Sequence, residues 1–280
     1  MNLRRFAVAL AITIGLAPAQ TRPPVRQEFA VASIKPNHAG CCTTYGAGNG
    51  GAGGKNVTLT MLIAFAYRVQ QFQISGGPRW IGSDRFDVDG KAEDPKADPE
   101  QLRLMLRSLF EDRFNLKLHR ETKTSPVYVL VVAKGGPKIK LSADQLSPDV
   151  NGPAPAGAGP NHGAIRIGAG NLVGNAVPLS QFATFFSQRL DRPIIDRTNL
   201  SGRFDIRLQW TPSAGENPFD PGGNRLPPAI IDMSGATVTV DFSGPSVFSA
   251  IQEQLGLKLE SAKAPVEVLV IDHVEKPSEN

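Results

Sequence analysis

Pro126-Val-Tyr-Val-Leu-Val-Val132 and Pro265-Val-Glu-Val-Leu-Val-Ile271 are the two segments that decide the fold of this chain. Each is an apolar run that begins with proline and follows a Leu-Lys-Leu block, at residues 116–118 and 257–259. Short runs rich in Val, Ile and Leu predict buried β-strands. Because the same pair of blocks occurs twice in one order, the sequence predicts two copies of one unit.

Two further pairs of blocks extend this repeat. Arg85-Phe-Asp-Val88 matches Arg203-Phe-Asp-Ile206, and Leu59–Tyr67 matches residues 179–186. Four blocks recur in the same order, and their spacings differ mainly by one insertion at 212–243. This pattern predicts an internal duplication.

A helix is predicted in the first copy between Asp98 and Asn115. Asp98 suits the N-cap, Pro99 the first helical position, and Gln101 the third position of a capping box. An apolar stripe at helical spacing follows, formed by Leu102, Met105, Leu106, Leu109, Phe110 and Phe114. Asn115 is suited to the left-handed residue that ends a helix.

The second copy shows the same helix pattern. The corresponding positions are Ser243, Val247, Ile251 and Leu255. Gly256 stands where the first copy has Asn115, and Gly and Asn are the two residues that best tolerate a left-handed cap.

We therefore expect an α+β fold of two duplicated lobes with mixed sheets. In each lobe the elements are predicted in the order strand, helix, strand, strand, helix, strand, strand. The lobes are assigned to residues 25–140 and 165–276, joined by a Gly/Pro-rich linker at 141–164. Strands at 29–34 and 165–173 open the two copies. Exchange of strands between the halves, which would fuse them into one core, predicts the same sequence pattern.

The first nineteen residues resemble a signal peptide. Arg4 and Arg5 precede an apolar run at 6–16, and Ala17-Pro-Ala19 offers small residues for cleavage before Gln20. The run is too short to span a bilayer, which requires about 20 residues. We expect an extracytoplasmic protein, periplasmic or secreted, without a stable membrane span after cleavage.

Composition and charge favour a folded protein and argue against nucleic-acid binding. The 280 residues are 41% hydrophobic and 20% charged, with 30 basic and 26 acidic side chains. Loss of Arg4 and Arg5 reduces the net charge from +4 to +2 (28 against 26). Basic residues between 103 and 120 alternate with acidic ones, as on a solvated helix face.

The only cysteines, Cys41 and Cys42, are adjacent. Their Cα atoms are about 3.8 Å apart across a trans peptide, which is below the usual disulfide range. A strained vicinal bridge, a bond to another chain and free thiols all remain open. Two such ligands without a neighbouring His or Cys cluster make a poor metal site, and no metal, cofactor or catalytic residue is assigned.

Few residues suggest chemistry. Strand alternation places Asp87 and Asp89 on one face, where paired carboxylates can act as acid and base. A solvated strand face is the plainer interpretation, because Arg85 shares it and the second copy has Asp205 followed by Arg207. The four histidines are far apart in the sequence, and a Ser–His–Asp site would have to assemble from distant positions.

Several separated blocks resemble a known family. They are residues 29–36, 59–67, 80–87, 106–118 and 196–204. Together they look like the soil-associated family of exported bacterial proteins of unknown function. The resemblance implies export and this architecture, and it brings no catalytic residues.

A weaker resemblance concerns the second half. Residues 200–208 and 246–271 look like the short N-terminal domain of secretins and TonB-dependent receptors. That resemblance implies a module for periplasmic protein–protein contacts. The insertion at 212–243 departs from it, and the chain has no plug or barrel sequence.

The sequence thus favours a non-enzymatic interaction protein with an extracytoplasmic protein partner. An open strand edge that pairs with an extended partner segment is the expected route. The alternatives are a hydrolase-type enzyme, with Asp87, Asp89 and His119 as the first candidate residues, and a small-ligand binder with a site between the lobes.

Overall fold

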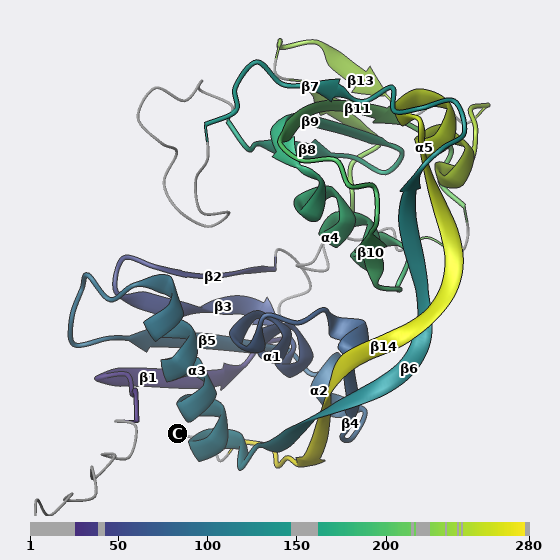
Figure 1. Cartoon of the computed structure of the whole chain (residues 1–280). Helices are drawn as coiled ribbons and strands as arrows, with labels where there is room; N and C mark the ends of the chain where they lie inside the picture. Colours follow the sequence, from purple (N-terminus) through teal and green to yellow (C-terminus); the bar gives the residue numbers. More distant parts are fainter. Residues whose placement is uncertain are drawn as a thin grey trace, which may run out of the picture.

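The structure is a computed structural model that describes residues 26–38, 43–146, 162–213, 216, 225–232, 234–239, 241 and 243–277. It confirms the α+β class: two lobes of sheet and helix are connected along one side by a pair of long strands (Figure 1). Within these residues no helix is long and apolar enough to cross a bilayer.

The first lobe contains an antiparallel sheet in the order β1-β5-β3-β2. Its strands are β1 (Val31–Pro36), β2 (Thr44–Gly48), β3 (Gly51–Val57) and β5 (Phe86–Lys91). Its helices are α1 (Leu59–Tyr67), α2 (Trp80–Ser83) and α3 (Pro99–Phe114). The apolar stripe of α3 packs into the core of this lobe, as its spacing predicts.

The second lobe repeats this plan in the order β7-β11-β9-β8. Its strands are β7 (Lys140–Leu141), β8 (Ile165–Ile167), β9 (Asn171–Pro178) and β11 (Arg203–Gln209). Its helices are α4 (Leu179–Arg189) and α5 (Val247–Leu255). The described parts of the 212–243 insertion include a hairpin of β12 (Ala229–Ile231) and β13 (Thr237–Thr239).

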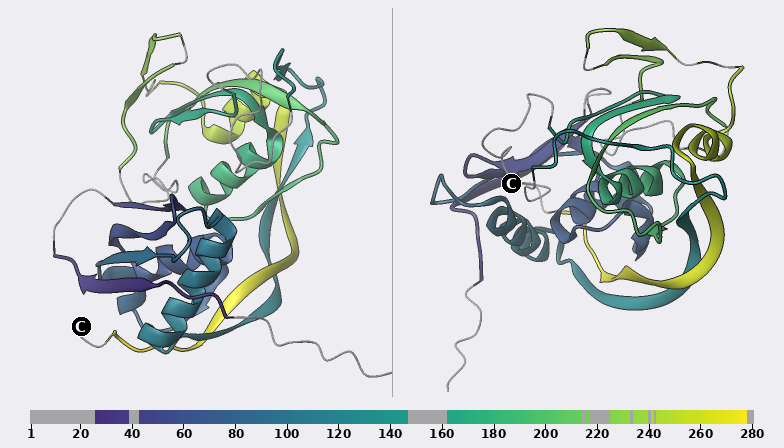
Figure 2. Two further views of the ribbon diagram at one scale, coloured as in Figure 1. Left: turned by 90° about the vertical axis from the view of Figure 1, so that its left-hand side faces the viewer. Right: turned by 45° about the horizontal axis from the view of Figure 1, so that its top comes forward.

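A third sheet joins the lobes, in the order β10-β6-β14-β4. Its strands are β4 (Ile74–Gly76), β6 (Lys117–Val132), β10 (Ile194–Asp196) and β14 (Leu257–His273). The short helix η1 (Gln71–Gln73) precedes β4. Strands β6 and β14 pair antiparallel along almost their whole length and bow around one side of the molecule (Figure 2).

The long strands correct one prediction. The expected order places two strands after the second helix of each copy, but the structure has one continuous strand of 16 or 17 residues there, which includes the apolar run. No glycine interrupts either strand, so nothing in the sequence forces a turn. Pro126 and Pro265 lie where β6 and β14 pair only with each other, because β10 pairs with residues 128–130 and β4 with residues 269–271. One side of each strand is open there, and the missing N–H is tolerated.

Each long strand contributes to both cores. The core of the first lobe includes Leu116, next to the start of β6, and also Leu269 and Ile271 near the end of β14. The core of the second lobe includes Leu130 from β6 and Leu257 from β14. The two lobes therefore keep separate cores while exchanging the ends of their last strands.

The helix ends follow the sequence closely, with one exception. Asp98 accepts hydrogen bonds from Glu100 and Gln101, and Asn115 is left-handed with φ 47°. Gly256 is left-handed with φ 65°, as predicted. Helix α5, however, is capped by Ser246 and not by Ser243, whose hydroxyl donates instead to Asp241.

Candidate functional site

Asp87, the first candidate for acid–base chemistry, holds a left-handed bulge in β3. Its Oδ1 accepts the backbone N–H of Asn56 at 2.9 Å and the Asn37 amide at 2.6 Å. Arg85 donates to the carbonyl of the same Asn56 at 2.9 Å, and Asn56 has φ 53°. Burial raises the pKa of Asp87, but the hydrogen bonds from Asn37 and Asn56 and the Lys55 ammonium outweigh it and leave this pKa below its ordinary value. A carboxylate held ionised in this way is a poor general acid.

The second half contains the same clamp. Asp205 accepts the backbone N–H of Ala176 at 3.1 Å, and Arg203 donates to the carbonyl of Ala176 at 2.6 Å. Ala176 also has a positive φ, 51°, and lies three residues before a helix as Asn56 does. The Arg-Phe-Asp block thus has a local structural role at both of its occurrences.

Asp89 and His119 do not assemble with Asp87 into a site. Asp89 is exposed, and its nearest charged partner is Lys91 at 4.0 Å. His119 lies on β6, where its Nδ1 is 2.9 Å from both carboxylate oxygens of Asp272 on the exposed ribbon. Among the described residues, no three His, Cys, Asp or Glu side chains gather as metal ligands would. Cys41 and Cys42 lie outside the described residues, as does the predicted signal peptide.

A groove between the lobes does exist. It has a volume of about 330 Å³ and is lined by Gln70, Phe72 and Gln73 on one side and by Ser180, Thr184 and Ile194, among others, on the other. None of Asp87, Asp89 and His119 lines it. Its described walls are mostly amides, hydroxyls and apolar groups.

The two lobes differ at one edge of their sheets. In the first lobe β1 covers the edge of β5 for six residues, from Pro36 opposite Phe86 to Val31 opposite Lys91. In the second lobe β7 covers the corresponding edge of β11 for two residues only, with Leu141 opposite Phe204 and Lys140 opposite Asp205. Both pairings are antiparallel and start opposite the phenylalanine of Arg-Phe-Asp.

The segment before Lys140 does not follow this edge of β11, because it is bound to the end of helix α5. The N–H groups of Lys138 and Ile139 donate to the carbonyl of Leu255 at 2.9 and 3.1 Å. Close approach at this point requires Gly256, since a Cβ there would clash with the carbonyl oxygen of Gly136. The segment before Lys140 is therefore pinned to the end of α5 and cannot continue along β11.

The departure of the chain leaves backbone groups of β11 open. Trp210 donates its N–H to Gly170 on the β9 side, so alternation directs the N–H and C=O of Arg207 and Gln209 to the opposite side. The Gln254 side chain pairs with Gln209, accepting its N–H at 3.0 Å and donating to its C=O at 2.7 Å. The N–H and C=O of Arg207 have no hydrogen-bond partner among the described residues.

A cavity of about 420 Å³ lies at this open edge, which we call the β11 notch. Its floor includes the buried Val173 and Leu255. Its charged lining consists of Lys138, Lys140, Arg207 and Asp205. Three cations and one carboxylate therefore surround a strand edge that is missing a partner.

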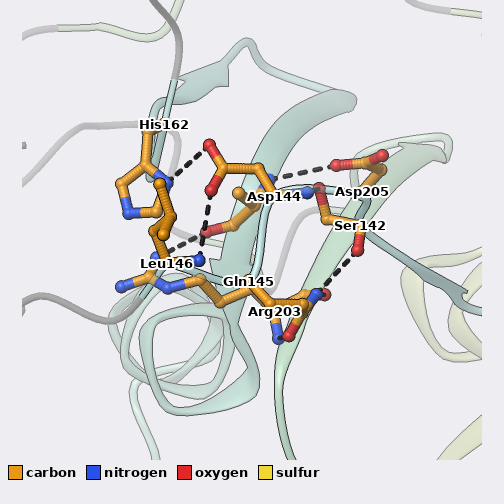
Figure 3. A network of polar contacts seen from close by, with 8 residues as sticks. Ser142, Asp144, Gln145, Leu146, His162, Arg203 and Asp205 are labelled. Atoms are coloured by element: carbon orange, nitrogen blue, oxygen red, sulfur yellow. Dashed lines mark hydrogen bonds and ion pairs between the residues drawn. The ribbon is translucent and has the colours of Figure 1, made fainter. Parts of the chain in front are cut away.

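The end of the notch beside Arg203 is held by a network of polar contacts (Figure 3). The N–H of Ser142 donates to the carbonyl of Arg203 at 2.8 Å, and the Gln145 amide both donates to that carbonyl and accepts the N–H of Arg203. The Nδ1 of His162, whose side chain is buried, lies 2.8 Å from the carboxylate of Asp144. The Nε2 of His162 is buried without a partner among the described residues, so this pair offers no reactive group to solvent.

The hairpin β12–β13 is tied to the far side of the notch. Arg207 donates to Asp232 at 2.7 Å, and Asp232 is also bonded by the hydroxyl and N–H of Ser234 and by the N–H of Ala236. The hydrogen bonds from Ser234 and Arg207 are the main reasons that the pKa of Asp232 lies far below its ordinary value. Asp232 therefore stays ionised at neutral pH and pairs with one side of the Arg207 guanidinium.

The sequence alone did not reveal the notch, although one signal was present. Lys35 in β1 lies opposite Asp87, and Lys140 in β7 lies opposite the equivalent Asp205. Each lysine follows an isoleucine, at positions 34 and 139. The two tryptophans have plain packing roles. Trp80 stacks on Phe114, and Trp210 is fully buried and donates to Glu216.

Comparison with known sequences places the chain at the level of a family. The sequence model described as "Protein of unknown function (DUF3738)" matches residues 60–274, which cover both lobes and the notch. No curated protein and no solved structure matches the chain. This result confirms the expectation of a family without an established activity, and the chain belongs to the DUF3738 family of proteins of unknown function.

Proposed function

We propose that the chain is an exported, non-enzymatic interaction protein that binds an extended segment of a partner protein along the open edge of β11. The observation that carries this proposal is the missing strand opposite Arg207. At the equivalent place in the first lobe, β1 pairs with β5 through Ser33 opposite Asp89. Addition of a partner strand at a sheet edge is a recurring mode of peptide recognition.

The proposed compartment rests on the signal-like N-terminal sequence, and the resemblance to periplasmic N-terminal domains supports the type of function. The contacts of Asp87 argue against the hydrolase alternative. Its carboxylate accepts hydrogen bonds from Asn37 and Asn56. Its counterpart Asp205 accepts the equivalent backbone N–H, although Arg207 stands there in the place of Asp89. The aspartate is thus held in the same way in a lobe that lacks the carboxylate pair.

A pair of substitutions at Arg207 tests the proposal. Arg207→Pro removes the outward N–H, which no residue of β9 uses, whereas Arg207→Ala removes the same side chain and keeps the N–H. The probe is a phage-displayed library of random heptapeptides, from which binders are selected on the wild-type protein. Their affinities are then measured for both variants.

We expect the selected peptides to bind Arg207→Pro at least about tenfold more weakly than Arg207→Ala, because a partner strand loses a backbone hydrogen bond and meets the proline ring. Circular dichroism and thermal unfolding establish that both variants are folded. Equal binding by two folded variants would overturn the proposal.

The groove between the lobes favours a second candidate, a small-ligand binder. Its volume of about 330 Å³ falls in the range of ligand sites, and both lobes contribute to its walls. Thr184→Trp fills the groove, and Gln252→Trp on the exposed face of α5 is the matched control. A compound that raises the melting temperature of wild type and of the control, but not of Thr184→Trp, would support this candidate.

A further inference from the structure

We infer that the partner segment bound at the β11 notch alternates acidic and small apolar residues; this inference rests on the proposed function and names the partner's chemistry. Two observations carry it. The charged lining of the notch has three cations to one carboxylate. The first lobe also shows, in its own β1, which side chains such a strand directs to each face.

The acidic residues follow from the outer face of the notch. Arg207 is 65% exposed, and Lys140 is exposed with no ion pair among the described residues. In β11 the side chains of Asp205, Arg207 and Gln209 point outward, whereas those of Phe204, Ile206 and Leu208 are buried. A partner residue opposite Arg207 therefore has its side chain on the outer face, beside Arg207 and two positions along the line of β7 from Lys140.

Electrostatics at this position favours a carboxylate. The one acidic side chain of the notch, Asp205, already accepts the N–H of Ala176. Asp232 occupies one nitrogen of Arg207 and leaves the remaining donors of the guanidinium available to a second carboxylate. Lys138 is turned toward the end of α5, where it donates to the carbonyl of Glu253, so Lys140 and Arg207 are the cations that face a partner.

The small apolar residues follow from the inner face. In β1 the inward residues are Ala32, opposite Gly90, and Ile34, opposite Val88 and 5% exposed. The position of Gly90 is taken in β11 by Leu208, which is buried. A partner residue opposite Leu208 thus meets a larger neighbour than Ala32 does and must be small.

Gln254 limits how far the partner strand extends. Its side chain already satisfies both outward groups of Gln209, much as a strand would. Pairing beyond Arg207 must displace this amide. Removal of the amide by Gln254→Ala therefore lengthens the available edge, and the partner segment is expected to bind more tightly to this variant.

The experiment compares three extended peptides of equal length on the full-length protein. Their sequences are Glu-Ala-Glu-Val-Glu-Ala-Glu, the same peptide with Ser at each Glu position, and the same peptide with Lys. Binding is followed by fluorescence anisotropy at low ionic strength, and the contact site is mapped by amide chemical shifts. The variants are Lys140→Glu with Arg207→Glu, and Gln254→Ala.

We expect the acidic peptide to bind about fivefold or more tightly than the serine peptide, and the lysine peptide to bind most weakly, because charges directly opposite across strands interact. The doubly reversed variant should prefer the lysine peptide. The acidic preference should shrink at high salt, where exposed charges are screened. Gln254→Ala should bind the acidic peptide more tightly than wild type does.

Failure of this inference can be told apart from failure of the proposed function. If the serine and acidic peptides bind β11 equally well, and charge reversal changes neither, the acidic partner is overturned while strand addition stands. If none of the three peptides shifts the amide signals of Arg207, both are overturned.

Discussion

The carboxylate of Asp205 accepts the backbone N–H of Ala176 at 3.1 Å, three residues before helix α4 begins. Asp87 and Asn56 form the same bond before helix α1. In both places a non-glycine residue with positive φ is held on two sides, by the aspartate at its N–H and by the preceding arginine at its C=O. These shared bonds support the proposal of an internal duplication, and with it the comparison between the covered edge of one lobe and the open edge of the other.

The bonds from Asp87 to Asn56 and from Asp205 to Ala176 are structural, so removal of either aspartate should destabilise the protein. The N–H groups of Asn56 and Ala176 belong to buried residues, and an unpaired buried donor costs about 1–3 kcal/mol. We expect Asp87→Ala and Asp205→Ala each to lower the free energy of unfolding by an amount in that range in urea titrations. Asp89→Ala, at an exposed position, is the control and should change it by less than about 0.5 kcal/mol. Equal effects of Asp87→Ala and Asp89→Ala would contradict the clamp.

Gly256 should be intolerant of a side chain. Its φ of 65° and the clash between an added Cβ and the Gly136 carbonyl oxygen both oppose alanine. We expect Gly256→Ala to lower the unfolding free energy by at least about 2 kcal/mol, since left-handed alanine alone costs about 1–2 kcal/mol. Gly135→Ala, where no atom lies within 4 Å of the added methyl group, is the matched control. A thermal shift of the same size in both variants would be evidence against the pinned turn.

The hairpin β12–β13 should loosen in acid. The pKa of Asp232 is lowered in the folded state by its bonds with Ser234 and Arg207, so the stabilisation is complete above the unfolded pKa of about 3.9 and is lost as the pH falls toward the folded value. We expect the Ser234 and Ala236 amides to lose protection between about pH 4 and pH 2, as seen by hydrogen exchange corrected for intrinsic rates. In Asp232→Asn the protection should be lower at neutral pH and nearly independent of pH over this interval. An unchanged profile in the variant would exclude Asp232 as the cause.

Strand exchange predicts that a substitution in one half of the sequence weakens the other lobe. Leu269 and Leu130 are both fully buried, and truncation of such leucines costs about 2–5 kcal/mol. Leu269→Ala should speed hydrogen exchange in α3 more than in α5, and Leu130→Ala should do the reverse. If each substitution acted mainly on the lobe of its own sequence half, the exchanged cores would be wrong.

Local patterns in the sequence were sufficient for much of the fold. Asp98, Pro99, Gln101 and Asn115 specify the ends of α3 through bonds between near neighbours, and Gly256 specifies the end of α5 through its left-handed backbone. The cap of α5 was misplaced at Ser243 because two serines, three residues apart, both precede the apolar stripe. Only Ser246 follows Pro245 directly into the helix and accepts the N–H of Ser249.

Long-range features could not be predicted in the same way. The exchange of β6 and β14 depends on which core each strand end enters, and Leu130 or Leu269 has the same apolar character in either arrangement. The β11 notch depends on Leu255 accepting the N–H of Lys138, a contact between residues more than a hundred positions apart. Ile34-Lys35 in β1 and Ile139-Lys140 at the start of β7 suggest strands of equal length, and only the structure shows that β7 is cut short.

Hydrogen exchange at the Arg207 amide is the sharpest test of the open edge. We predict that this amide exchanges quickly in the free protein, because no described residue accepts its N–H, and that saturation with the acidic peptide slows its exchange at least about tenfold. Asp89 occupies the equivalent position in β5, and β1 covers that edge. Its amide should therefore be protected with or without peptide. An Arg207 amide that is protected in the free protein, or that is not slowed by saturating peptide, would contradict the proposal that β11 offers an open edge to a partner strand.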